Sequence, residues 1–142
     1  MTVSRAMMRL LRIREIEEEQ IQGALDAAMS EMRQIETALA AARERERRGR
    51  QLVTDSVASN DGIDRIAGQE EARAAEKVQE ILTPRIAEMQ QAIAALREEF
   101  LGKRIERRQV ETLIKESETS HAIEMERRAQ QEIDDWFLRR GM

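Results

Sequence analysis

A heptad repeat of apolar and small residues is the feature that most constrains how this chain can fold. Between Ile21 and Val53 such residues recur at alternating steps of four and three. The positions are Ile21, Leu25, Ala28, Met32, Ile35, Leu39, Ala42, Glu46, Gly49 and Val53. Residues at this spacing lie along one face of an α-helix and form the contact line, or seam, of a coiled coil. The repeat therefore predicts one long helix that pairs with another.

A second repeat occupies the C-terminal half of the chain and begins around Ile63 and Ile66. Its alanine-rich first part continues through Ala72, Ala74, Ala75, Val78 and Leu82. A regular alternation of three and four then runs through Ile86, Met89, Ile93, Leu96, Phe100, Lys103, Arg107, Val110, Ile114, Ser117 and His121. This second seam is apolar in its middle and polar towards the C-terminus, and it predicts a second long helix.

The segment between the two repeats reads TDSVASNDG, and such a cluster of Ser, Asn, Asp and Gly is typical of a turn. Two seams joined by a short turn can bury their narrow apolar faces against each other. We therefore expect an all-α fold, a long antiparallel two-helix coiled-coil hairpin that forms a single domain over residues 1–142. Its helices should span about 4–53 and 63–140, with the tip at about 54–62 and the second helix the longer one.

Two features are expected to disturb the helices. Ile13 and Ile16 fit a register displaced by one residue from the first seam, so the stripe should shift around residues 17–20. Pro84 lacks an amide hydrogen and crowds the preceding turn, so it should kink the second helix or interrupt it, with Thr83 as the N-cap of a new helix. We favour the interruption.

The second helix should be longer than its partner. If the turn is centred near residue 58, Met7 lies opposite about residue 109, and most of residues 110–142 have no partner within the chain. Four glycines interrupt the helices at about 1 kcal/mol each relative to alanine. These residues, which indicate weak points or close helix approach, are Gly23, Gly49, Gly68 and Gly102.

The composition excludes several classes of protein. Only 2% of the residues are aromatic while 37% are charged, a poor basis for a thick globular core. The chain has no cysteine, which fits a reducing compartment, and no apolar stretch long enough to cross a membrane. Because no small-residue cleavage site follows the basic start, we expect no cleaved signal. The expected location is the cytoplasm, with peripheral association at the inner face of the cell membrane left open.

Candidate catalytic groups are sparse. His121 is the only histidine, and it lies at a seam position where a solvated or seam role is the simpler interpretation. Carboxylate pairs are abundant, but raising the pKa of a carboxyl group requires burial in a pocket, which a two-stranded coiled coil does not offer. We therefore expect no catalytic residues, no cofactor and no metal site, and hence no enzyme.

Nucleic acid is also an unfavourable partner for this chain. The formal net charge is −4, and the most basic stretch, ARERERRGR at residues 42–50, is interrupted by Glu44 and Glu46. No aromatic residue lies beside it to stack on a base.

The two ends of the chain carry the features that suggest binding. Arg5, Arg9 and Arg12 follow helical spacing with no acidic residue among them, which suits a solvated face, an acidic protein partner or anionic lipid. Trp136 and Phe137 fall in the unpaired segment, where exposed aromatic residues are common interface anchors. Crossing of two chains, or folding back onto the first helix, is the alternative for that segment.

The order of these features resembles the FliJ family, the small coiled-coil components of flagellar type III export, and the related YscO-type injectisome proteins. The resemblance covers nearly the whole chain. The matching elements are the start MMRLLRIREIEEEQ at residues 7–20, the tip after Leu52, ERRQVETLIKE at residues 106–116, and the ending ERRAQQEIDDWFLRR at residues 126–140.

The resemblance implies a stalk protein that binds two components of the export apparatus. Its paired ends would enter the ring of the export ATPase, which places Arg5, Arg9 and Arg12 on one strand and Arg139 and Arg140 on the other. The helix after the tip would contact the cytoplasmic domain of the export gate through a face near Ala75, Val78 and Leu82.

Our sequence-based hypothesis is thus a non-enzymatic central stalk or adaptor of a type III (flagellar) protein export apparatus. It would bind the export ATPase through the basic and aromatic ends. A generic dimeric coiled-coil scaffold or tether is the alternative, motivated by the unpaired segment with Trp136 and Phe137.

Overall fold

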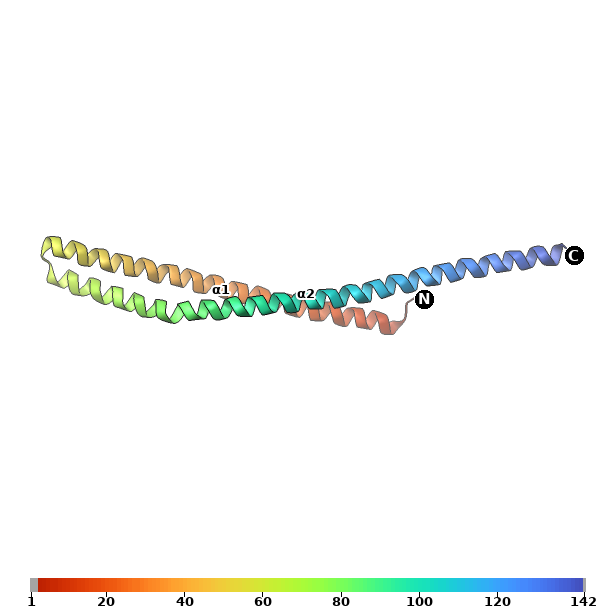
Figure 1. The fold of residues 1–142 in the computed structure, drawn as a ribbon, viewed down its shortest axis with the longest axis horizontal. Coiled ribbons are helices and arrows are strands. Elements are labelled where there is room, and N and C mark those ends of the chain that lie inside the picture. Colours follow the sequence, from red (N-terminus) through yellow and green to blue (C-terminus); the bar gives the residue numbers. More distant parts are fainter. Residues whose placement is uncertain (1–2, 142) are drawn as a thin grey trace. The chain divides into compact units, whose positions relative to one another are not determined.

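The computed structural model describes residues 3–141, which form two long α-helices. Helix α1 spans Arg5–Ser59 and helix α2 spans Gly62–Arg140. They pack against each other as a helical hairpin, with the turn between them visible at the left of Figure 1. No strand occurs within the described residues. This confirms the predicted all-α hairpin, in which the second helix, with 79 residues, is longer than the first, with 55.

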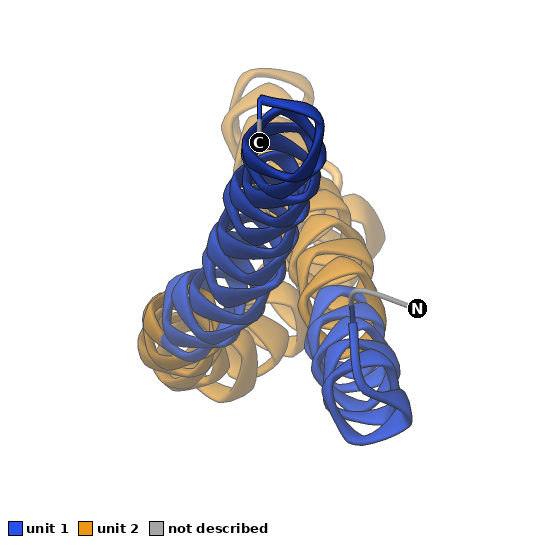
Figure 2. Cartoon of the chain, turned by 90° about the vertical axis from the view of Figure 1, so that its right-hand side faces the viewer, with its two compact units in different colours: residues 1–22, 99–142 blue, residues 23–98 orange. Residues whose placement is uncertain are grey.

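The chain divides into two compact units, which are coloured separately in Figure 2. The first, here called the hairpin unit, comprises residues 23–98 and includes the turn. The second, here called the terminal unit, combines the described residues before Gly23 with those after Glu98, so it holds the start of α1 and the C-terminal part of α2.

The core of the hairpin unit is built by the predicted heptad seam. Leu25, Met32 and Ile93 are buried in one apolar cluster. Half-buried side chains pack around this cluster: Ala28, Met29, Ile86, Met89 and Leu96. All predicted seam positions from Ile21 to Val53 are buried or half-buried, so the register of the first helix is confirmed over this range. Cross-helix ion pairs, such as Arg85 with Glu31 at 2.8 Å, flank the seam.

Small residues replace large ones where the hairpin unit approaches the turn. The buried positions here are Ala42, Gly49 and Ser56 of α1 and Gly68, Ala72 and Ala75 of α2. Ile63 and Ile66, in contrast, are exposed, so the predicted start of the second seam is wrong. A step of four back from Ala72 leads to Gly68, which has no side chain to mark it as a core position. The two helices approach closely here because the seam residues have small side chains or none.

The turn is shorter than predicted because α1 continues to Ser59. The short polar side chains of TDSVAS bond within the helix: Thr54 Oγ1 donates to the Arg50 carbonyl at 3.1 Å, and Ser56 Oγ donates to the Val53 carbonyl at 2.7 Å. Helix α1 ends at Ser59. The next residue, Asn60, has a left-handed φ of 59°, and the Asp61 amide donates to the Ser56 carbonyl at 3.0 Å.

Asp61 also caps α2. Its Oδ1 accepts hydrogen bonds from the amides of Ile63 and Asp64, at 3.0 and 3.2 Å, which satisfies free donors of the first helical turn. Two residues, Asn60 and Asp61, therefore end one helix and begin the next.

Helix α2 runs through Pro84, so the predicted interruption there is wrong, while the kink stays a prediction. Pro84 lies on the exposed side of the helix, where water can solvate the carbonyl that loses its amide partner. Thr83 does not act as an N-cap, since its Oγ1 donates to the Gln79 carbonyl at 2.8 Å in the manner of a mid-helix threonine.

In the terminal unit, the seam of α1 continues without a shift, contrary to our prediction. Counting back from Ile21 in the same steps, the covered positions are Glu18, Arg14, Leu11 and Met7, all half-buried. Ile13 is 51% exposed and Ile16 is also exposed. Charged side chains can occupy the seam here because α2 supplies partners of opposite charge, as described below.

Helix α2 is covered by α1 for longer than predicted. Val110 is buried, and Ile114 and Ser117 are half-buried. From Glu118 to Gly141 every residue is exposed, and this includes His121, which we had placed in the seam. The unpaired segment therefore begins near residue 118 and not near residue 110, because the turn lies later in the chain than residue 58. We call Glu118–Gly141 the free segment.

Candidate interaction surface

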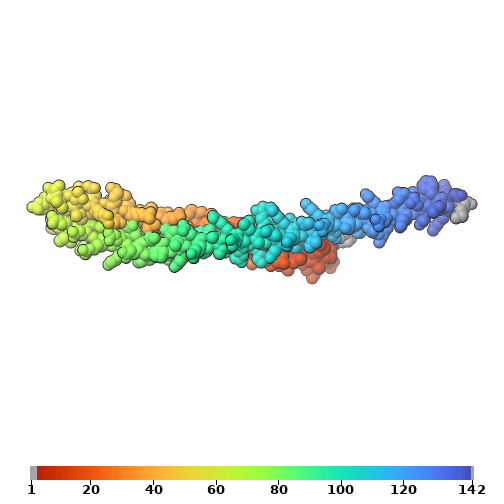
Figure 3. Space-filling view, viewed as in Figure 1, coloured from red at the N-terminus to blue at the C-terminus, as the bar shows by residue number. Residues whose placement is uncertain are grey.

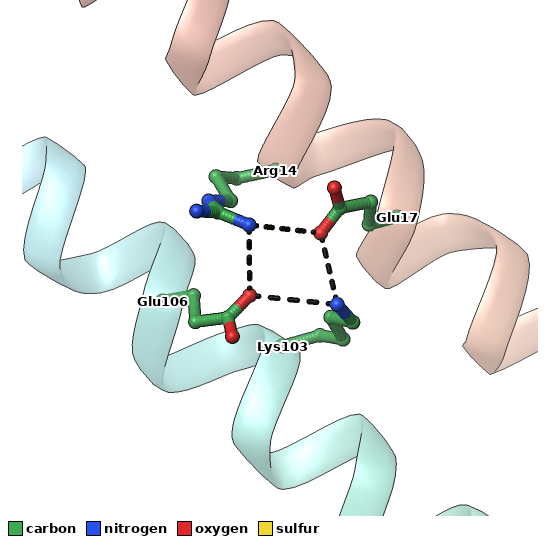
Figure 4. Close-up of polar contacts among 4 residues, drawn as sticks. All are labelled: Arg14, Glu17, Lys103 and Glu106. Atoms are coloured by element: carbon green, nitrogen blue, oxygen red, sulfur yellow. Dashed lines mark hydrogen bonds and ion pairs between the residues drawn. The ribbon is translucent and has the colours of Figure 1, made fainter.

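Charged side chains occupy the seam of the terminal unit and form a closed ring of ion pairs (Figure 4). Arg14 Nη1 lies 3.2 Å from Glu17 Oε2 and 3.1 Å from Glu106 Oε2. Lys103 Nζ lies 3.1 Å from the same Glu17 oxygen and 3.6 Å from Glu106 Oε2. Each cation thus contacts both carboxylates, and the ring ties the start of α1 to α2.

A neighbouring set extends this ring. Arg107 bonds to Glu18 across the helices and to Glu111 on its own helix, the latter at 2.6 Å. The hydrogen bonds to Glu18 and Glu111 raise the pKa of Arg107. Sequence reasoning missed Arg14 and Glu18 as seam positions, although continuing the alternation of four and three back from Ile21 would have found them.

The ring also shifts the pKa values of Glu17 and Lys103. The hydrogen bond from Lys103 lowers the pKa of Glu17, with a further contribution from Arg14, while desolvation opposes both. The same bond with Glu17 raises the pKa of Lys103. Both shifts favour the charged forms of Glu17 and Lys103, as expected for an ion pair that ties the two helices together.

The N-terminal arginines that we predicted as a binding face are exposed. Arg5, Arg9 and Arg12 lie on the side of α1 that faces away from α2, whereas Arg14 turns towards the ion-pair ring. Arg12 contacts Glu15 at 3.4 Å. Ile13 and Ile16 share this outward side, which is therefore basic and partly apolar.

The free segment carries an aromatic and basic cluster near its end. The rings of Trp136 and Phe137 meet edge to face, with centroids 5.1 Å apart and an angle of 82°. The guanidinium carbon of Arg140 lies 4.6 Å from the Trp136 ring centroid, within range of a cation–π interaction. Trp136 is 50% exposed and Phe137 63% exposed, and no other part of residues 3–141 covers this end of α2 (Figure 3).

The two predicted parts of the ATPase-binding end do not form one site. The register of the Arg14–Glu106 and Glu17–Lys103 pairs places the start of α1 beside α2 near Ser117. Trp136 lies 19 residues further along the same helix, roughly 30 Å at 1.5 Å per residue. Arg139 and Arg140 therefore stand apart from the basic face of α1.

The predicted gate-contacting residues lie along the seam of the hairpin unit. Ala75 is completely covered, with 0% exposure, and Val78 and Leu82 are half-buried. A partner could reach Ala75 only if the two helices separated.

Between residues 3 and 141, no three His, Asp or Glu side chains are placed to hold a metal ion together. Neither helix, over its described length, contains a stretch apolar enough to cross a membrane.

The fold and these surfaces define a helical hairpin of the coiled-coil class whose longer helix projects a free segment with an aromatic and basic end. Comparison of the chain with protein-family models, with curated proteins and with solved structures found no match. The resemblance to FliJ therefore rests on the sequence features described above.

Proposed function

We propose that this protein is a non-enzymatic stalk or adaptor of a type III export apparatus, and that it binds the export ATPase through the free segment. The observation that carries this proposal is the exposed cluster of Trp136, Phe137 and Arg140 in the free segment, the part of α2 that lies beyond α1. Aromatic and arginine side chains dominate the binding energy of protein interfaces. Exposure of such a cluster to water is unfavourable unless a partner buries it.

The basic face of α1 supplies a second, weaker contact in this proposal. Arg5, Arg9 and Arg12 present positive charge to a partner and would speed its association with an acidic surface. Because this face lies about 30 Å from Trp136 along the helix, the ATPase contacts are spread along the terminal unit. The gate contact is proposed through Val78 and Leu82, without Ala75, which is covered.

Co-purification with a type III export ATPase tests the proposal. Replacing Trp136 and Phe137 together by alanine should weaken binding by more than about tenfold, since two exposed anchors are lost. The matched control replaces Ile63 and Ile66 by alanine, because these large apolar side chains are also exposed but lie beside the turn.

Deletion of residues 127–142 should abolish the interaction, and deletion of residues 1–14 should slow association. If binding is indifferent to both deletions and to the double alanine variant, the proposed function is wrong at this surface.

A further inference from the structure

The free segment carries an apolar stripe that does not continue the hairpin seam. The seam, extended beyond Ser117, would pass through polar and charged residues from His121 to Asp135 and would reach an apolar residue only at Leu138. Ile123, Phe137 and Leu138 are exposed elsewhere on the free segment, but five other apolar side chains follow a different line along the same helix. They are Ala122, Met125, Ala129, Ile133 and Trp136, all exposed. Their spacing is three, four, four and three, which reads the same in both directions and is symmetric about Ala129.

We propose that this stripe pairs with the same stripe of a second copy of the chain, in antiparallel orientation, with the two Ala129 residues facing each other on the twofold axis. A spacing that is symmetric about one residue is what such a pairing requires, since each contact must occur twice. In this alignment Trp136 lies opposite Ala122 of the other copy, and Met125 lies opposite Ile133. The large Trp136 thus meets a small alanine, Met125 and Ile133 pack on each other, and the central alanines allow close approach.

Charge complementarity supports a second copy of the chain as the partner that covers this stripe. One further step of four beyond each end of the stripe leads to Glu118 and to Arg140. In the antiparallel alignment these two residues lie opposite each other at both ends of the interface. A parallel alignment would instead place each against its own copy, with like charges together, so the charges select the antiparallel form.

The edge of the stripe repeats this complementarity. Arg128 and Glu132 lie on one edge, on either side of Ala129, and antiparallel pairing brings each beside its opposite in the second copy. Within one chain Arg128 contacts Glu124 at 3.4 Å, but both side chains are more than half exposed. Such exposed pairs contribute little, so Arg128 can change partners. Arg140, which stacks on Trp136, is already held at the end of the stripe.

This self-association does not rest on the proposed function, because it involves the chain alone. It does use Trp136, so pairing of two copies and binding of the ATPase would compete. A failure of one proposal can be told from a failure of the other, since the experiments below contain no ATPase.

Cysteine cross-linking tests the orientation. The natural chain has no cysteine, so Ala129→Cys and Ala122→Cys each introduce a single thiol. Under mild oxidation Ala129→Cys should form a disulfide-linked dimer, because the two thiols meet on the axis. Ala122→Cys should link poorly, because its counterpart is Trp136. Equal linking of both variants, or a monomeric Ala129→Cys, overturns the antiparallel pairing.

The mass of the full-length chain, measured by light scattering over a concentration series, tests the interface itself. Ala129→Glu should prevent dimers, because two carboxylates would face each other, whereas Gln131→Glu adds the same charge on the far side of the helix and should leave them. Glu118→Arg and Arg140→Glu should each weaken dimerisation by about tenfold, with two pairs lost per dimer, and the combined variant should restore it. A natural chain that stays monomeric throughout, or equal dimerisation of the two glutamate variants, overturns the proposal.

Discussion

Gly49 and Gly68 face each other across the hairpin at a distance that leaves no room for a side chain. A Cβ atom on Gly49 would lie 2.7 Å from the Gly68 carbonyl oxygen, and one on Gly68 would lie 2.6 Å from the Gly49 carbonyl oxygen. Both obstacles are backbone atoms of the opposite helix and cannot rotate away. This pair therefore sets how closely α1 and α2 approach near the turn.

Gly49→Ala should destabilise the protein. The overpacked methyl group forces the helices apart at a cost of about 1–3 kcal/mol, only partly offset by the better helix propensity of alanine, about 1 kcal/mol. We expect a net loss of up to about 2 kcal/mol, measured by urea unfolding. Gly23→Ala is the matched control: a Cβ on Gly23 meets nothing within 4 Å, so the change should stabilise by about 0.5–1 kcal/mol. Equal effects of the two changes would contradict the close approach.

Pro84→Ala should stabilise α2. Proline inside a helix is about 3 kcal/mol less favourable than alanine, and here the residue is exposed, so alanine loses no packing. Because the surroundings have adapted to proline, we expect a gain of about 1–3 kcal/mol in thermal or urea unfolding. A loss of stability would show that the backbone geometry imposed by Pro84 stabilises the hairpin.

Acid should loosen the terminal unit. The pKa of Glu17 is lowered in the folded protein by Lys103, so its contribution is present above its ordinary pKa of 4.5 and is lost as pH falls through the lower folded value. Amide exchange of residues 5–22 should therefore accelerate below pH 4.5 by more than the intrinsic chemistry predicts. In Glu17→Gln this acid-dependent part should be smaller; an unchanged profile would exclude Glu17 as its source.

Salt should act selectively on the same unit. At about 1 M salt the Debye length is about 3 Å, so the contacts among Arg14, Glu17, Lys103 and Glu106 are screened. The apolar cluster around Leu25, Met32 and Ile93 is not weakened in this way. Hydrogen exchange should therefore speed up in residues 5–22 on adding salt and stay unchanged or slow in residues 23–50. Uniform behaviour of both segments would contradict a charge-dependent seam.

The hairpin could be predicted from the sequence because large apolar side chains mark the seam positions in its central part. The spacing of these side chains identifies one buried face of the first helix. They are Leu25, Met32, Ile35 and Leu39, and all four are buried. The prediction failed where the seam contains other residue types. Gly68 has no side chain to recognise, and Arg14 and Glu18 are core positions only because α2 offers them partners of opposite charge.

One end of a helix was predicted correctly from the sequence and another was not. The end of α2 at Arg140 agrees with the sequence-based estimate, whereas α1 passes through Thr54 and Ser56, residues that we interpreted as turn formers. Their hydroxyl groups bond to carbonyls of their own helix, which composition alone does not reveal.

The exposed aromatic end at Trp136 and Phe137 was predicted from the lack of a partner helix, and the structure leaves both exposed.

The central claim is that the free segment is the surface through which this protein engages its partner. Hydrogen exchange of the full chain, with and without a saturating type III export ATPase, tests it most directly. We expect slower exchange at residues 118–140 on binding and unchanged exchange around the turn, at residues 57–66. Slower exchange at the turn, with residues 118–140 unchanged, would contradict it.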